Sequence, residues 1–174
     1  RKDKTPIVWS SEAEAAYEKT KEDLANAACI AHPSPDSQLS LACDASNIGM
    51  GAVLQQQEDD TLQPLGFFSK AFNKAQQNYS TYDRELLAVY EAIRYFRPMI
   101  EGRNIFIYTD HKPLTYAMLQ SNKTLCPRRL RQLNYISQFT TDIRYQRGED
   151  NTVADALSRI AEVTVLNNFR ISLK

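Results

Sequence analysis

The sequence is short of cysteine and glycine and has no long apolar run, and each shortage argues against a class of protein. The cysteines are few, widely spaced and without a C-x-x-C pair, which argues against a disulfide framework or a zinc ribbon and favours a reducing compartment: Cys29, Cys43 and Cys126. No apolar run exceeds five residues, whereas a membrane-spanning helix needs roughly 18 to 20. Five glycines and seven prolines among 174 residues argue against a fibrous or low-complexity chain. The chain begins Arg1-Lys2-Asp3-Lys4 with no apolar signal segment, so we expect a non-secreted piece of a longer protein.

What is present fits one folded domain with an uneven distribution of charge. Hydrophobic residues make up 43% and charged residues 24% of the chain, a globular composition at a length typical of roughly one domain. The formal net charge is zero, yet residues 94–147 contain ten Lys or Arg against three acids. Such a basic half is typical either of solvated helix faces or of a surface that binds phosphates, and charge counts leave both open.

The N-terminal part of the chain has its own pattern. Small and apolar residues at helical spacing predict an amphipathic helix within residues 5–31, and Ser11 with Glu14 fits the S/T-x-x-E capping box that begins a helix. The stretch 32–37 then breaks the helix, because its two prolines remove donors and bias their predecessors away from helical angles. We expect a connecting segment, a main domain and a C-terminal extension, at residues 1–37, 38–160 and 161–174.

After residue 37 the pattern predicts an α/β fold. Three strand-like runs are joined by short turns, which favours an antiparallel meander at residues 38–43, 51–57 and 63–69. A long helix over residues 81–101, capped by Ser80 or Thr81 and ended by Gly102, then leads into a strand at 104–109, and such a crossover makes parallel neighbours. The remaining segments predict two helices, a fifth strand and a closing helix, at residues 113–119, 128–138, 141–146 and 152–160. The sum is a mixed five-stranded sheet, three antiparallel strands and then two parallel ones, flanked by helices.

Four carboxylates are predicted to converge at one edge of this sheet. Asp44 and Asp110 each follow a strand, and ligands of open α/β sheets gather beyond the carboxyl ends of the strands. Glu85 falls on the first turn of the long helix, and Asp155 lies near the start of the last one. Clustered carboxylates raise one another's pKa or bind cations, and two Mg²⁺ ions about 4 Å apart suit the hydrolysis of a phosphodiester. Taken singly, each of the four also fits an ordinary turn former or helix cap.

Four blocks of sequence resemble the ribonuclease H domain of gypsy-type LTR retrotransposon Pol polyproteins, which include reverse transcriptase. In order they read CDASNIGMGAVL, NYSTYDRELLA, YTDHKPL and VADALSR, at residues 43–54, 78–88, 108–114 and 153–159. Residues 5–37 resemble the connection that joins the polymerase domain to this domain. The resemblance implies a ribonuclease H-like fold. It also implies hydrolysis of the RNA strand of RNA/DNA hybrids during reverse transcription, leaving 5′-phosphate and 3′-hydroxyl ends.

The resemblance also implies roles for particular residues. Two Mg²⁺ ions, with Mn²⁺ as the alternative, would be held by the four carboxylates: Asp44 bridges both ions, Asp155 completes the site of the ion that activates water, and Glu85 with Asp110 holds the other. Such hybrids are recognised by shape and by 2′-hydroxyl groups, for which we expect polar side chains near the carboxylates: Ser46, Asn47, Ser80, Thr81 and His111. The expected phosphate contacts are basic: Lys112, Arg128, Arg129, Arg131 and Arg147. Turn and cap chemistry stays the alternative for Asn47 and Ser80, and solvated surface for each basic residue.

The resemblance further implies partners and a location. The partners are the RNA/DNA hybrid and the polymerase domain of the same polyprotein, with no membrane, in a cytoplasmic virus-like particle. One departure concerns a histidine that cellular and retroviral relatives carry on a loop shortly before the last Asp, because residues 145–151 here contain none. We expect activity to survive with slower turnover, and His111 either forms hydrogen bonds or acts as a general acid in its place.

Three other functions stay open. A catalytically silent module that binds hybrids would share the fold, although the intact carboxylate set argues against it. A host-domesticated interaction module is a further alternative that a single sequence leaves open. An integrase or transposase would share the fold and the metals, but it normally needs only three carboxylates.

Overall fold

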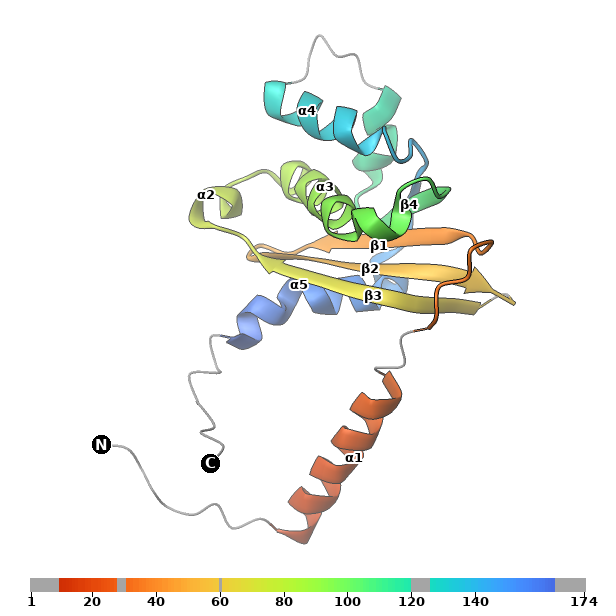
Figure 1. Cartoon of the computed structure of the whole chain (residues 1–174). Coiled ribbons are helices and arrows are strands. Elements are labelled where there is room, and N and C mark those ends of the chain that lie inside the picture. Colours follow the sequence, from red (N-terminus) through yellow and green to blue (C-terminus); the bar gives the residue numbers. More distant parts are fainter. Residues whose placement is uncertain (1–9, 28–30, 60, 120–125, 165–174) are drawn as a thin grey trace. The chain divides into compact units, whose positions relative to one another are not determined.

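The computed structural model describes residues 10–27, 31–59, 61–119 and 126–164 (Figure 1). The chain divides into two compact units, Arg1–Ile30 and Ala31–Lys174. The first contains helix α1, Ser11–Ala27. Its cap is Ser10, whose side-chain oxygen accepts a hydrogen bond from the Ala13 N–H at 3.2 Å. The predicted capping box was therefore wrong by one residue, since Ser11 already lies inside the helix.

The second unit is built on a five-stranded sheet with the order β3-β2-β1-β4-β5. Strand β1 (Leu39–Ala45) pairs antiparallel with β2 (Gly49–Glu58), which pairs antiparallel with β3 (Thr61–Ala71). On its other side β1 pairs parallel with β4 (Ile105–Thr109), which pairs parallel with β5 (Ile143–Tyr145). The predicted mixed sheet is confirmed.

Helices cover both faces of the sheet (Figure 1). Helix α3 (Thr81–Ile100) lies on one face with α4 (Pro127–Ile136) packed against it, and α5 (Thr152–Thr164) lies on the other face. Apolar side chains of α3 recur every three or four residues and are buried against the sheet: Leu86, Val89, Ile93, Phe96 and Ile100. Burying each such side chain stabilises the fold by roughly 1.5–3 kcal/mol. Ser80 caps α3 by accepting from the Asp83 N–H, and Gly102, with φ +76°, follows its end, both as predicted.

The differences from the sequence prediction are short elements and element ends. The pattern missed the single-turn helix α2 (Lys74–Gln77) and the 3₁₀ turn η3 (Gly148–Asp150), because one turn is too short to show a hydrophobic period. The helix predicted at 113–119 is a 3₁₀ helix, η1 (Lys112–Leu119). Strand β5 has three residues where six were predicted, and α5 extends four residues further than predicted.

The proline-containing linker, residues 32–37, is hydrogen-bonded to the folded domain. The buried amide of Gln56 on β2 donates to the His32 carbonyl at 3.0 Å and accepts from the Ser34 N–H at 2.9 Å. Arg103 donates to the carbonyls of Ser34 and Ser37, both at 2.8 Å. The domain boundary expected after residue 37 stays a prediction, but these bonds join the linker to β2. In the part of the chain that the structure describes, no helix combines the length and apolarity needed to cross a membrane.

Candidate active site at the carboxyl edge of the sheet

Two parallel strands bring the first pair of carboxylates together. Ala42 of β1 pairs with Tyr108 of β4, and continuing this register by two residues sets Asp44 opposite Asp110. Asp44 is only 6% exposed, because β2 and α5 cover its strand. The edge predicted from the strand order is therefore the edge where these two side chains meet.

Glu85 reaches the same edge from helix α3. The Ser80 cap fixes where the helix begins, and Glu85, 3% exposed, lies one turn further along. One carboxylate oxygen from each of Asp44, Glu85 and Asp110 lies within 4.8 Å of the others. The sequence prediction that these three converge is confirmed by this geometry.

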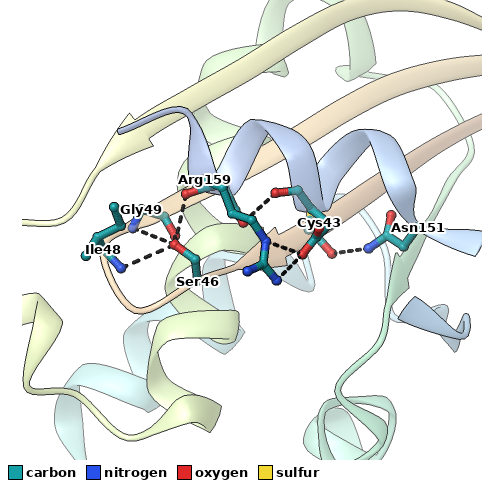
Figure 2. Close-up of polar contacts among 8 residues, drawn as sticks. Cys43, Ser46, Ile48, Gly49, Asn151 and Arg159 are labelled. Carbon is teal, nitrogen blue, oxygen red and sulfur yellow. Dashed lines mark hydrogen bonds and ion pairs between the residues drawn. The ribbon is translucent and has the colours of Figure 1, made fainter. Parts of the chain in front are cut away.

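The fourth carboxylate comes from α5, which sits unusually close to the sheet. Gly51 on β2 makes this possible, because a Cβ atom there would lie 2.5 Å from the Ala154 carbonyl oxygen and from the Ser158 nitrogen. Figure 2 shows how polar contacts fasten the helix: the buried side chain of Asn151 donates to the Cys43 carbonyl at 3.0 Å. The Ser46 hydroxyl donates to the Ser158 carbonyl at 2.9 Å. The start of α5 is thereby held against β1 beside Asp44.

Asp155 lines the same cavity but lies outside the close group of three. The cavity measures about 420 Å³ and has all four carboxylates in its wall. Asp155 is bound by Arg159, which donates from both Nε and Nη2 to the single oxygen Oδ1, at 2.8 and 2.6 Å. The charge of Asp155 nevertheless contributes to raising the pKa of Asp44, so the two groups interact.

The close packing of acids is electrostatically unfavourable without a cation. Burial, with the charges of Asp44 and Asp110, raises the pKa of Glu85 to about 9. Burial also raises the pKa of Asp44, with the charges of Asp110 and Asp155 adding to the effect. Among the described residues, the buried Oε2 of Glu85 has no hydrogen-bond partner. An all-carboxylate donor set with an unpartnered buried oxygen fits a hard divalent cation, which would neutralise the acids and take up the free oxygen.

Most of the polar residues expected to contact substrate lie in this cavity. Ser46, Asn47, Thr81 and His111 line it. Ser80 instead caps α3 and donates from its hydroxyl to Asp83 at 2.7 Å. The ring of His111 packs edge-on against Tyr82 with the centroids 6.0 Å apart, and burial lowers its pKa.

The expected phosphate contacts are spread more widely. Arg129 forms a double ion pair with the buried Asp83, from Nε to Oδ1 at 2.7 Å and from Nη2 to Oδ2 at 2.8 Å. Arg128 contacts the same carboxylate at 3.2 Å. These arginines, chiefly Arg129, hold the pKa of Asp83 well below its usual range. Lys112, Arg131 and Arg147 are exposed and lie outside the wall of the cavity. Arg128 and Arg129 therefore tie α4 to the first turn of α3.

Sequence reasoning missed the two basic residues of the cavity wall, Arg84 and Arg159. A signal existed for each. Arg84 directly precedes Glu85, and Arg159 follows Asp155 by four residues, the spacing that places two side chains on one helix face.

Comparisons with known proteins identify relatives of this chain. Residues 9–107 match the family model of the RNase H-like domain found in reverse transcriptase. The Pol polyprotein of transposon 412 from Drosophila melanogaster is 36% identical over 91% of this chain. The transposon Tf2-3 polyprotein of Schizosaccharomyces pombe is 33% identical over 90% of it. The chain spans 13% and 12% of the length of these two relatives.

Solved structures share the fold at lower sequence identity. RNase H1 from the archaeon Halobacterium salinarum is 16% identical, with a TM-score of 0.55 over 73% of this chain and 98% of that one. A foamy viral protease-reverse transcriptase solved in complex with an RNA/DNA hybrid is 18% identical, with a TM-score of 0.53 over 82% of this chain and 20% of that one. The predicted resemblance and the predicted ribonuclease H-like fold are both confirmed, and the chain belongs to the family of RNase H-like domains found in reverse transcriptases.

Proposed function

We propose that this domain hydrolyses the RNA strand of RNA/DNA hybrids during reverse transcription of an LTR retrotransposon. The observation that carries the proposal is the group of three carboxylate oxygens within 4.8 Å, at the edge of the sheet and in the same cavity as Asp155. Two divalent cations, Mg²⁺ or Mn²⁺, would supply an activated water and charge stabilisation for the leaving oxygen, which yields 5′-phosphate and 3′-hydroxyl ends. An RNA/DNA hybrid is bound by a foamy viral reverse transcriptase of the same fold, which supports the choice of substrate.

The carboxylates hold the cations in this proposal. Asp44 would contribute to both ion sites, because it interacts with the charges of both Asp110 and Asp155. Glu85 and Asp110 would hold one ion, and Asp155 would complete the other site. Because Asn151 and Gly51 fix α5, the position of Asp155 depends on the fold and not on the ion alone.

The remaining predicted residues act on the hybrid. In this proposal the side chains that line the cavity would bind 2′-hydroxyl groups near the cut: Ser46, Asn47, Thr81 and His111. Ser80, with Lys112, Arg128, Arg129, Arg131 and Arg147, stays a prediction as a contact to the hybrid backbone. The ion pairs of Arg128 and Arg129 with Asp83 mean that phosphate binding there competes with an existing partner. A polymerase domain of the same polyprotein and a cytoplasmic virus-like particle also stay predictions.

The test is cleavage of a labelled RNA/DNA hybrid with Mg²⁺. Single-stranded RNA and double-stranded DNA serve as matched substrates, and Asp44→Asn and EDTA as controls. Cutting of the hybrid RNA alone, abolished by both controls, supports the proposal. Binding without cutting, unchanged when the polymerase domain is added, contradicts it and favours a catalytically silent module.

A further inference from the structure

The acidic cavity also contains two guanidinium groups that the metal chemistry does not use. Arg84 comes from α3 and Arg159 from α5, helices that lie on opposite faces of the sheet (Figure 1). Both side chains line the cavity together with the four carboxylates. The cavity wall therefore combines a cation-binding set of acids with two fixed positive charges.

The bonds of Arg159 show a side chain held in place but open to the cavity. Its Nε and Nη2 both donate to one oxygen of Asp155, and its side chain is 58% exposed. An exposed ion pair four residues apart on a helix stabilises a protein little. Arg97, in the last turn of α3, and Glu101, the C-cap residue of α3, form a pair with the same spacing and the same two donor atoms. The Arg159 pair differs because it lies in the cavity wall.

Arg84 has a similar position on the other helix. Its Nη1 donates to the Gln77 carbonyl at 3.3 Å, a long hydrogen bond. Its Nε is enclosed and, among the described residues, has no hydrogen-bond partner. A guanidinium group presents five donors in a fork that matches the oxygens of a phosphate, so weakly bonded donors here favour an anionic ligand.

Charge balance points to the same ligand. Two divalent cations would neutralise the four carboxylates, so the wall of the loaded cavity would carry the net positive charge of its two arginines. Each phosphodiester of a nucleic-acid strand carries one negative charge. We propose that Arg84 and Arg159 bind phosphates of the RNA strand on either side of the bond that is cut, an inference that rests on the proposed function above. In the domain without substrate, Asp155 holds the Arg159 guanidinium in the position from which it meets the strand.

The test measures hybrid binding in Ca²⁺ over a series of salt concentrations. The variants are Arg84→Gln, Arg159→Gln and Arg159→Lys. Arg97→Gln is the matched control, because it removes an exposed arginine–carboxylate ion pair with the same spacing outside the cavity. The logarithm of the binding constant falls linearly with the logarithm of the salt concentration, and each lost phosphate contact makes this slope shallower by about 0.7–0.9. We expect this loss in both Gln variants, with binding about 5–10-fold weaker at low salt, a smaller loss for Arg159→Lys, and no change for Arg97→Gln.

Each outcome decides one of the two proposals. Slopes equal to that of the control overturn the phosphate role, while hybrid cleavage by the unmodified chain still supports the proposed function. If Arg159→Gln weakens hybrid binding in Ca²⁺ but leaves the salt slope unchanged, Arg159 only orients Asp155 and the inference is wrong. If the unmodified chain neither binds nor cuts the hybrid, both proposals fail. Thermal unfolding of every variant checks that the fold is retained.

Discussion

The close approach of α5 to the sheet at Gly51 gives the sharpest mutational prediction. In Gly51→Ala the new methyl group would lie 2.5 Å from the Ala154 oxygen and the Ser158 nitrogen, and 2.7 Å from the Leu157 carbonyl carbon. All three are backbone atoms, so no side-chain rotation relieves the contact. Ordinary contact begins near 3.4 Å, which requires α5 to move by about 0.9 Å.

The size of the effect follows from this displacement. Overpacking of this kind costs roughly 1–3 kcal/mol, which lowers the Tm of a domain of this size by roughly 2–12 °C. Asp155 moves with α5, and a misplacement of about 1 Å at a catalytic group reduces the rate on the order of 100-fold. We therefore expect a folded, moderately destabilised protein that has lost nearly all cleavage of the hybrid.

Gly66→Ala is the matched control for this prediction. Its methyl group would lie 2.9 Å from the ring of Phe96, so it also overpacks the core, but against a side chain on the other face of the sheet. We expect a comparable loss of Tm with cleavage retained at temperatures where the protein is folded. Equal activity of the two variants, or a Gly51→Ala protein with unchanged Tm and rate, would refute the argument that the glycine positions Asp155.

Three further predictions concern charge, the linker and the cation. Arg129→Ala leaves the buried Asp83 carboxylate with weaker partners, so we expect a loss of about 2–4 kcal/mol in urea unfolding at pH 7. Because the folded-state pKa of Asp83 is lowered, this contribution is present above about pH 4 and fades as the pH falls; a loss independent of pH would argue against it. Deletion of residues 1–36 removes backbone partners of the buried Gln56, so relative to deletion of residues 1–30 it should cost a further ~1–3 kcal/mol, about one or two buried hydrogen bonds. Glu85, with a pKa of about 9, is protonated at pH 7 when no cation is bound, so we expect Mg²⁺ binding to release a proton and the affinity for Mg²⁺ to rise from pH 7 to 9. Titration calorimetry in two buffers of different ionisation enthalpy measures the released proton.

The sequence predicted the sheet and the carboxylate site because both depend on strong, repeated patterns. The apolar period of α3 continues from Leu86 to Ile100, about four turns, and the crossover that this helix forms predicts that β4 runs parallel to β1, as observed. Once those strands are adjacent, Asp44 and Asp110 have to meet. Single-turn elements such as α2 and the cap at Ser10 depend on one or two hydrogen bonds, which leave no comparable pattern.

The role of Gly51 shows a second limit of sequence reasoning. A glycine in a strand is typical of a bulge or of a close backbone approach, and the sequence does not say what approaches. Here the neighbour is a helix more than a hundred residues later in the chain, fastened by Asn151 to the Cys43 carbonyl. Contacts of this kind exist only after the chain has folded, so they have no local signature.

Charge counting was the least informative pattern, for a physical reason. The basic stretch 94–147 contains Arg128 and Arg129, yet both are paired with Asp83, which lies outside it. The arginines of the cavity wall, Arg84 and Arg159, also lie outside that stretch. The strength of an interaction between two charges depends on their distance and burial and not on their separation along the chain. Whether a basic side chain is paired with an acid or open to solvent is therefore decided by the fold. The positive charges available to the phosphates of a nucleic-acid strand have to be sought beside the carboxylates in the structure.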